Sequence, residues 1–186
     1  MRLPTGKVED PDILQDLALG DGQTDLLLRL HVDFLGIKKL CLDGTVRYDI
    51  QLPDKQTKRV PDSVDHPVTA NKEVVKRNLG DIFQFEFMGK YEFAQPLSGG
   101  VKYLYVKKAK DHIDGNMGFN YSSLEDETNM EHHNAFVFLE YSTLPMYTEK
   151  KFSVPLNLKF EYRNRFAGRN NATKSQYLAF SADFFF

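Results

Sequence analysis

The residues best suited to chemistry lie in one polar stretch of the chain. They are Glu125, Asp126, Glu127, Glu131, His132 and His133. Carboxylates and imidazoles are both metal ligands and acid–base groups. Their spacing follows no established ligand pattern, and adjacent histidines on a strand point to opposite faces, so His132 and His133 would not reach one metal together. We therefore predict a solvated acidic segment here.

Two further groups are candidate sites. Asp111, Asp114, Gly115 and Asn116 form an oxygen-rich turn, but their spacing departs from an EF-hand loop and the terminal Glu is missing. Cys41 is the only cysteine, has no predicted base partner, and is interpreted as a buried thiol. No glycine-rich phosphate loop is present. The sequence thus predicts no catalytic residue, metal or cofactor, and a protein that is not an enzyme.

Basic residues near the end of the chain are the remaining candidates. The 186 residues carry a formal net charge of −2, yet residues 150–186 hold seven basic and only two acidic side chains. If these basic groups share a surface, they can contact the phosphates of a nucleic acid without recognising its base sequence. The alternative is that they form a solubilising strand face. The predicted nucleic-acid-binding residues are Lys150, Lys151, Arg163, Arg165, Arg169 and Lys174.

Strict alternation of apolar and polar residues predicts the strands that must position these groups. From Phe152 to Arg163 every second residue is apolar, which is typical of a strand with one wet face. Residues 26–35 and 42–52 alternate in the same way, and residues 177–186 end the chain with the same pattern. Residues 135–141 are apolar on both faces, as in a buried central strand.

One segment favours a helix instead. Asn71 can cap a helix over residues 71–79, Val74, Val75 and Leu79 would share one face, and Gly80 suits the position after its end. Phe and Tyr are abundant, which favours strands elsewhere. We predict an all-β fold, an antiparallel two-sheet sandwich of the eight-stranded jelly-roll type with one short helix.

The predicted organisation is an N-terminal arm over residues 1–22 and a single jelly-roll β-sandwich domain over residues 23–186. The arm is acidic and contains Pro4 and Pro11. No apolar run approaches the roughly 20 residues of a membrane helix. The first residues lack the pattern of a signal peptide, so secretion is not expected.

The segment 121–162 resembles the last strands of the coat proteins of geminiviruses and related circular single-stranded DNA viruses. In those proteins a polar segment with an Asn-Ala pair leads into an apolar strand, a turn of the Pro-aliphatic-Tyr type and a last alternating strand. The matching pieces here are Glu131, Asn134-Ala135, Phe136 to Tyr141, Pro145-Met146-Tyr147 and Leu156 to Tyr162. The resemblance covers about a quarter of the chain. Such coat proteins usually begin with an arginine-rich arm, whereas this chain begins acidic.

The resemblance implies a structural viral capsid protein that self-assembles into a shell enclosing single-stranded DNA. Its expected partners are copies of itself and nucleic acid, with no membrane, and its expected location is the virion and, during assembly, the host nucleus or cytoplasm. The exposed C-terminal strand is expected to add to a neighbouring subunit's sheet. The alternative is a non-enzymatic ligand- or protein-binding β-sandwich whose site lies in the loops 53–70 and 107–133.

Overall fold

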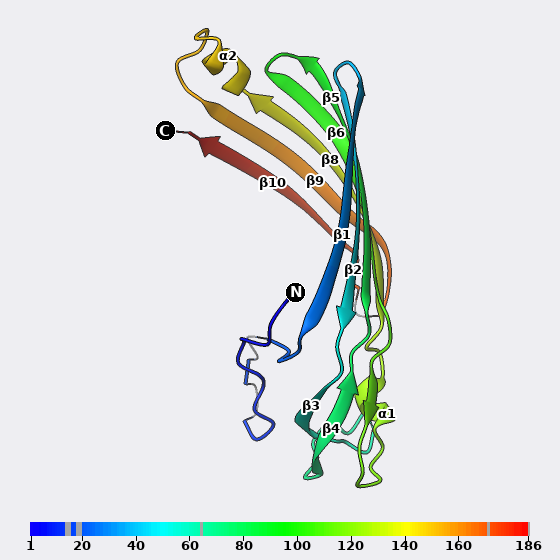
Figure 1. Ribbon diagram of the computed structural model, residues 1–186. Coiled ribbons are helices and arrows are strands. Elements are labelled where there is room, and N and C mark those ends of the chain that lie inside the picture. Colours follow the sequence, from blue (N-terminus) through cyan, green and yellow to red (C-terminus); the bar gives the residue numbers. More distant parts are fainter. Residues whose placement is uncertain (14–15, 18–19, 64, 171, 186) are drawn as a thin grey trace. The chain divides into compact units, whose positions relative to one another are not determined.

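Strands make up most of the chain in a computed structural model that describes residues 1–13, 16–17, 20–63, 65–170 and 172–185 (Figure 1). The described part contains ten strands and two short helices. In chain order the elements are β1 (Asp25–Ile37), β2 (Leu40–Gln51), β3 (Asp54–Arg59), β4 (Lys72–Asn78), β5 (Ile82–Ala94), β6 (Leu97–Lys108), β7 (His112–Asp114), α1 (Ser122–Glu125), β8 (Met130–Ser142), α2 (Leu144–Thr148), β9 (Leu156–Arg169) and β10 (Ser175–Phe184).

The strands form two antiparallel sheets, as the sequence predicts for an all-β fold. The larger sheet has the strand order β1-β2-β5-β6-β8-β9-β10, and the smaller has the order β3-β4-β7. Ten strands form instead of the expected eight. Within each sheet neighbouring strands follow one another in chain order, and this is a meander, whereas a jelly roll needs the crossed order of Greek keys. Short turns explain the difference, because a two-residue turn such as Lys38-Lys39 can only join adjacent antiparallel strands.

The chain divides into two compact units. Unit 1 contains residues 1–29, 47–83 and 107–131, and unit 2 contains residues 30–46, 84–106 and 132–186. The smaller sheet and α1 belong to unit 1. The strands β9 and β10 and the helix α2 belong entirely to unit 2.

The predicted helix over residues 71–79 is wrong, because β4 occupies this segment. Residues along β4 alternate strictly between exposed and buried, and Glu73, Val75 and Arg77 are the buried ones. Val74, expected to share a face with Val75, is 57% exposed. β4 pairs with β3 and β7 on its two sides, so its backbone groups are satisfied by the sheet. The β-branched pair Val74-Val75 suits this extended backbone better than a helix.

Unit 1 is held together by a small core and one buried carboxylate. Val60, Val75 and Ile113 form the core, and three partly buried side chains pack against it. These are Phe119, Tyr121 and Leu124. Glu73 accepts hydrogen bonds from the Tyr121 hydroxyl at 2.6 Å and from the Asn116 amide at 2.5 Å. These bonds, that from Tyr121 first, hold the pKa of Glu73 below its usual value.

Unit 2 presents two faces of its sheet that differ in chemistry. Ring contacts place Tyr103, His133 and Phe166 together on one side, and the register of β10 on β9 pairs Phe180 with Phe160 on the same side. This side we call the apolar face. Its exposed members are Leu30, Val32, Phe34, Val46, Phe87, Val101, Val137, Leu139, Phe160, Phe166, Leu178, Phe180 and Phe184.

The opposite side we call the charged face. Contacts between strands define it, such as Lys90 with Glu140 at 2.7 Å and Lys102 over the Phe136 ring at 4.3 Å. Its members are His31, Asp33, Asp43, Thr45, Glu86, Lys90, Lys102, His132, Asn134, Phe136, Phe138, Glu140, Lys159, Glu161, Arg163, Arg165 and Tyr177. Phe136, Phe138 and Asn134 are buried under the longer side chains of this face.

Strands β1 and β10 are the two edges of the larger sheet. All ten residues of β10 are exposed, and Leu178 and Phe180 are 66% and 69% exposed. β10 ends at Phe184, and Phe186, which the sequence assigned to the same strand, lies outside the described residues. Neither described helix has the length and apolar character needed to cross a membrane.

We predict that Tyr121→Phe lowers the urea midpoint of unfolding, because it removes the hydroxyl that donates to the Glu73 carboxylate. Urea unfolding followed by circular dichroism measures the change. Tyr147→Phe is the matched control, since Tyr147 is 45% exposed and its hydroxyl bonds to none of the described residues. Equal unfolding midpoints for the two variants would contradict the role given to Glu73.

Candidate nucleic-acid interface

Two arginines of β9 converge on a single neutral oxygen of β8. Arg163 and Arg165 are two residues apart, so their side chains leave the strand on the same face. Asn134 Oδ1 accepts bonds from Arg163 Nε at 3.1 Å, from Arg163 Nη2 at 2.9 Å and from Arg165 Nε at 3.3 Å. No carboxylate of the described residues lies within ion-pair distance of either guanidinium. The pair therefore carries two positive charges that only dipoles compensate.

Asn134 is oriented by His132, the next residue on the same face of β8. Because Asn134 Oδ1 accepts from both arginines, its Nδ2 donates to His132 Nδ1, 2.8 Å away. His132 must therefore be unprotonated at Nδ1. Burial lowers the pKa of His132 from its ordinary value of 6.5, and the charges of Arg165 and Arg163 lower it further. A neutral His132 thus holds the amide in the orientation that receives the arginines.

Aromatic rings flank the arginine pair. The Arg163 guanidinium lies over the Phe136 ring at 5.5 Å and over the Tyr177 ring at 5.3 Å, and its Nη1 also donates to the Tyr177 hydroxyl at 3.3 Å. Lys102 covers the same Phe136 ring from β6. Cations interleaved with aromatic rings can contact phosphates and stack against bases. We call Arg163, Arg165, Asn134, Phe136 and Tyr177 the arginine cluster.

Four of the six predicted binding residues lie on β9 or in the loop that follows it. Arg165 and Lys174 border a shallow depression between β9 and β10, and Arg169 ends β9 and is exposed. The depression is lined by Asn164, Arg165, Phe166, Lys174, Ser175 and Gln176. Of the predicted residues, Arg165 and Lys174 therefore border one depression, whereas Arg163 and Arg169 are six residues apart along β9.

The other two predicted residues lie elsewhere. Lys150 and Lys151 follow α2, beyond the opposite end of β9 (Figure 1). Leu156, the first residue of β9, lies about 30 Å from Arg165 along the strand, at about 3.3 Å per residue. Lys151 also pairs with Glu149 at 2.7 Å. The six residues therefore form two separate basic groups.

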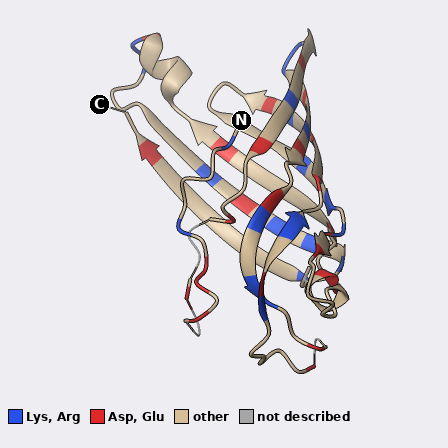
Figure 2. Cartoon of the chain, turned by 60° about the horizontal axis from the view of Figure 1, so that its bottom comes forward, with Lys and Arg blue, Asp and Glu red and all other residues tan. Residues whose placement is uncertain are grey.

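Acidic and basic residues both occur along the strands of the larger sheet (Figure 2), and several of them pair on the charged face. Lys102 lies 3.6 Å from Glu86, and Lys159 lies 2.7 Å from Glu161. These pairs neutralise each other, so most of the face carries little net charge. The arginine cluster differs from its surroundings because its cations have no such partners among the described residues.

The histidines and acids of the polar stretch 125–133 do not form one site. His132 and His133 point to opposite faces of β8, as expected of neighbours on a strand. His133 Nδ1 lies 2.7 Å from the Tyr103 hydroxyl, on the apolar face. Glu125 accepts from the Ile113 amide at 2.8 Å and serves local structure in unit 1.

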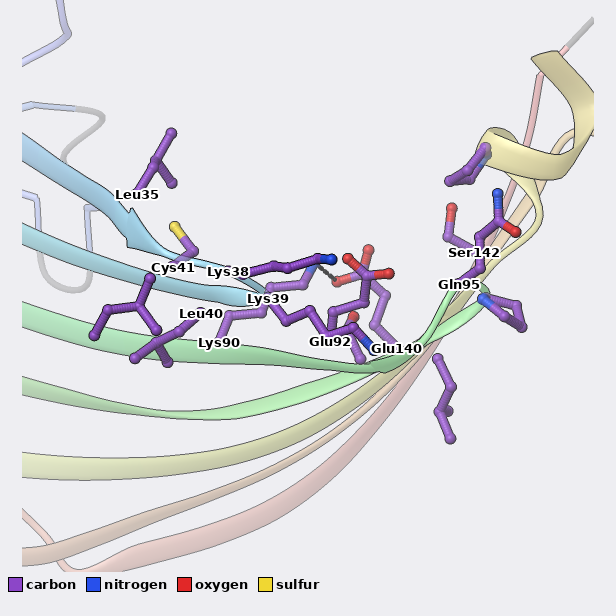
Figure 3. A pocket seen from close by; sticks show the side chains of 15 residues that line it. Leu35, Lys38, Lys39, Leu40, Cys41, Lys90, Glu92, Gln95, Glu140 and Ser142 are labelled. Atoms are coloured by element: carbon purple, nitrogen blue, oxygen red, sulfur yellow. Dashed lines mark hydrogen bonds and ion pairs between the residues drawn. The ribbon is translucent and has the colours of Figure 1, made fainter. Parts of the chain in front are cut away.

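A pocket of about 450 Å³ lies at the hairpin ends of unit 2 (Figure 3). Its walls come from the β1–β2 turn, the β5–β6 turn and the end of β8. Cys41 lines this pocket and is only partly buried, so the sequence prediction of a buried thiol is wrong. Cys41 lies near the hairpin end, where few side chains cover it.

The two loops of the alternative hypothesis do meet in unit 1. A cleft of about 830 Å³ is lined by Pro61, Pro67, Val68 and Thr69 from one loop and by Asp111, Ile113 and Leu124 from the other. Residues of the N-terminal segment also line it, and Asp12 pairs there with Arg59 at 2.7 Å and with Lys72. The charges around this cleft thus largely compensate one another. Val64 lies outside the described residues.

Sequence reasoning found the arginines but missed the residues that bind them. Arg163 and Arg165 stand out by charge and by their spacing of two. The sequence shows Asn134 only as part of an Asn-Ala pair, and Tyr177 only as a strand residue. Alternation places each on a face, but only the pairing of β8, β9 and β10 brings them together.

No known protein family matches the chain, and no curated protein is detectably similar to it. The coat-protein resemblance of residues 121–162 therefore stays a prediction.

We predict that the free energy of unfolding falls as the pH drops below about 6.5. The folded state keeps His132 neutral in a range where the unfolded chain takes up a proton, so this stability is complete above the unfolded pKa and is lost below it. The slope contributed by this group is at most about 1.4 kcal/mol per pH unit.

The measurement is urea unfolding at pH 7.5 and 5.5 for the wild type and for His132→Gln. Gln keeps a hydrogen-bond acceptor but cannot titrate in this range, so the variant should lose less stability between the two pH values. An identical loss in both proteins would contradict the neutral state assigned to His132.

Proposed function

We propose that the protein is a structural subunit that associates with copies of itself and holds single-stranded nucleic acid, in the manner of a viral coat protein. The observation that carries the proposal is the arginine cluster, in which two guanidinium groups lack carboxylate partners among the described residues. Such groups favour a polyanion. The proposed role is binding and assembly.

The arginine cluster is best suited to contact the phosphates of a nucleic acid without recognising particular bases. Arg163 is packed between two rings and bonded to Asn134, which holds its side chain in place, whereas Arg169 and Lys174 are exposed and free to follow a backbone. Tyr177 offers a ring at the edge strand for stacking. These features support a sequence-independent single-strand contact.

Self-association is supported by the apolar face and by the two edge strands. The exposed members of the apolar face come from six neighbouring strands of unit 2 and from the edge strand β1. Soluble monomers rarely expose contiguous apolar areas beyond a few hundred Å². The edges β1 and β10 also offer unpaired backbone groups to another strand. One further copy can cover the face, and another can pair with an edge strand.

One second candidate is favoured by the same apolar face. Aliphatic and aromatic side chains that alternate with charged ones also suit a sheet that lies against lipid, because lipid covers apolar area as a protein partner does. The two candidates differ in what covers the apolar face: a second copy of the chain or lipid. An experiment can distinguish them.

We predict that Arg165→Gln with Arg169→Gln weakens binding of a fluorescent 30-nucleotide oligo(dT) and lowers the salt dependence. The slope of log K against log salt should decrease in magnitude by about 1.4, at about 0.7 for each lost phosphate contact. Fluorescence anisotropy across a salt series measures both quantities.

Lys38→Gln with Lys39→Gln is the matched control, because it removes the same charge from the β1–β2 turn. This control should bind as the wild type does. A third variant, Lys150→Gln with Lys151→Gln, shows whether the second basic group takes part. Equal weakening by all three variants would indicate a general charge effect and contradict the assigned site.

We predict that Leu178→Lys with Phe180→Lys prevents self-association, because it places two charges on the apolar face of the edge strand. Ala179→Lys with Ser181→Lys adds the same charges to the other face of β10 and should associate normally. Light scattering after size-exclusion chromatography measures the mass, and circular dichroism checks that both fold. The self-association proposal fails if both variants keep the mass of the wild type. Liposome flotation of the wild type, lost only in the first variant, would favour the lipid candidate.

A further inference from the structure

A second cluster gathers potential metal ligands from the strands β1 and β2 of unit 2. His31 and Asp33 lie two residues apart on β1, and Asp43 and Thr45 lie two apart on β2, so each pair shares a face. His31 Nε2 is 3.0 Å from Asp43 Oδ2 and 3.3 Å from Asp33 Oδ1. The ligand atoms of these three side chains all lie within 4.8 Å of one another. One imidazole nitrogen and two carboxylates thus surround a common point.

The distances fit a shared cation. Zinc binds nitrogen and oxygen ligands at about 2.0–2.2 Å. At bond angles between tetrahedral and octahedral values, two such ligand atoms lie about 3.0–3.5 Å apart. Both distances from His31 Nε2 fall in that range.

The ring of His31 is oriented from its other nitrogen. Nδ1 lies 2.7 Å from Thr45 Oγ1, which can accept its proton. In the tautomer with the proton on Nδ1, the Nε2 lone pair faces the two carboxylates and can bind a cation placed between them. A second hydrogen-bonding group that fixes the tautomer is a usual companion of a metal-bound histidine.

Burial and local charge also favour a cation between His31, Asp33 and Asp43. The Asp43 side chain is only 7% exposed. Within the described part of the chain, no lysine or arginine lies within ion-pair distance of Asp33 or Asp43. Buried carboxylates are normally paired with a cation or a metal.

We infer that His31, Asp33 and Asp43 form a binding site for a divalent transition-metal ion, with Zn²⁺ the best match. Imidazole with carboxylates suits Zn²⁺ better than Mg²⁺ or Ca²⁺, which prefer oxygen ligands alone. His31 and Asp33 are half exposed, so water can complete the coordination. The bound ion links the edge strand β1 to β2. This inference is independent of the proposed function.

The first experiment uses the full chain, stripped with EDTA and dialysed, and titrates it with ZnCl₂ and separately with MgCl₂ by isothermal calorimetry. We expect one Zn²⁺ per chain, a rise in the melting temperature with Zn²⁺, and no comparable effect of Mg²⁺. His31→Gln and Asp43→Asn should each weaken Zn²⁺ binding at least tenfold.

The matched control is His112→Gln. His112 also lies near two carboxylates, but Asp114 faces its Nε2 and Glu125 faces its Nδ1, so these cannot converge on one ion. The control should bind Zn²⁺ as the wild type does. The site is overturned if the wild type shows neither binding nor a rise in melting temperature, or if the control loses as much affinity as His31→Gln. If a site variant fails to fold, the visible absorption of Co²⁺ added to the wild type decides: bands that Zn²⁺ displaces support the site, and their absence overturns it.

Discussion

The alternation of apolar and polar side chains along the larger sheet is the constraint on which the rest depends. One face of the sheet in unit 2 becomes apolar and the other charged, because successive residues of a strand point to opposite sides. The buried positions of unit 2 lie on the charged face, where long basic side chains cover Phe136 and Phe138. The apolar face has no such cover among the described residues. Exposed apolar area of this kind drives association more strongly than any single contact.

The charged face explains why the arginines can stay unpaired. Its acids and bases mostly neutralise one another, whereas Arg163 and Arg165 meet an amide that His132 holds in place. A neutral acceptor fixes the guanidinium groups without cancelling their charge. The positive potential therefore remains available to a ligand. The cluster around His31 shows the converse case. Its two carboxylates have no lysine or arginine partner among the described residues, so they suit a metal ion.

Much of the fold could be predicted, because alternation is a local property of the sequence. The strands β1, β2, β9 and β10 follow from it directly. Residues 71–79 misled the prediction because a single pair, Val74-Val75, fits both a helix face and a strand, and only pairing with β3 and β7 decides between them. The order of the strands in the sheet could not be predicted from alternation, because jelly rolls and meanders use strands with the same pattern.

The candidate site was predictable only in part, for a related reason. The charge and spacing of Arg163 and Arg165 are visible in the sequence, whereas Asn134 joins them through the pairing of β8 with β9. His31, Asp33 and Asp43 could have been found by laying the first two predicted strands side by side as a hairpin. Their polar faces would then have met.

The central claim is that copies of the chain cover the apolar face. The most direct measurement is the mass of the purified wild type by light scattering in detergent-free buffer, at low and high salt, with the absorbance ratio at 260 and 280 nm. The account predicts a particle many times the 21.4 kDa of one chain, carrying nucleic acid at low salt. A monomer of 21.4 kDa without nucleic acid in both buffers would contradict it.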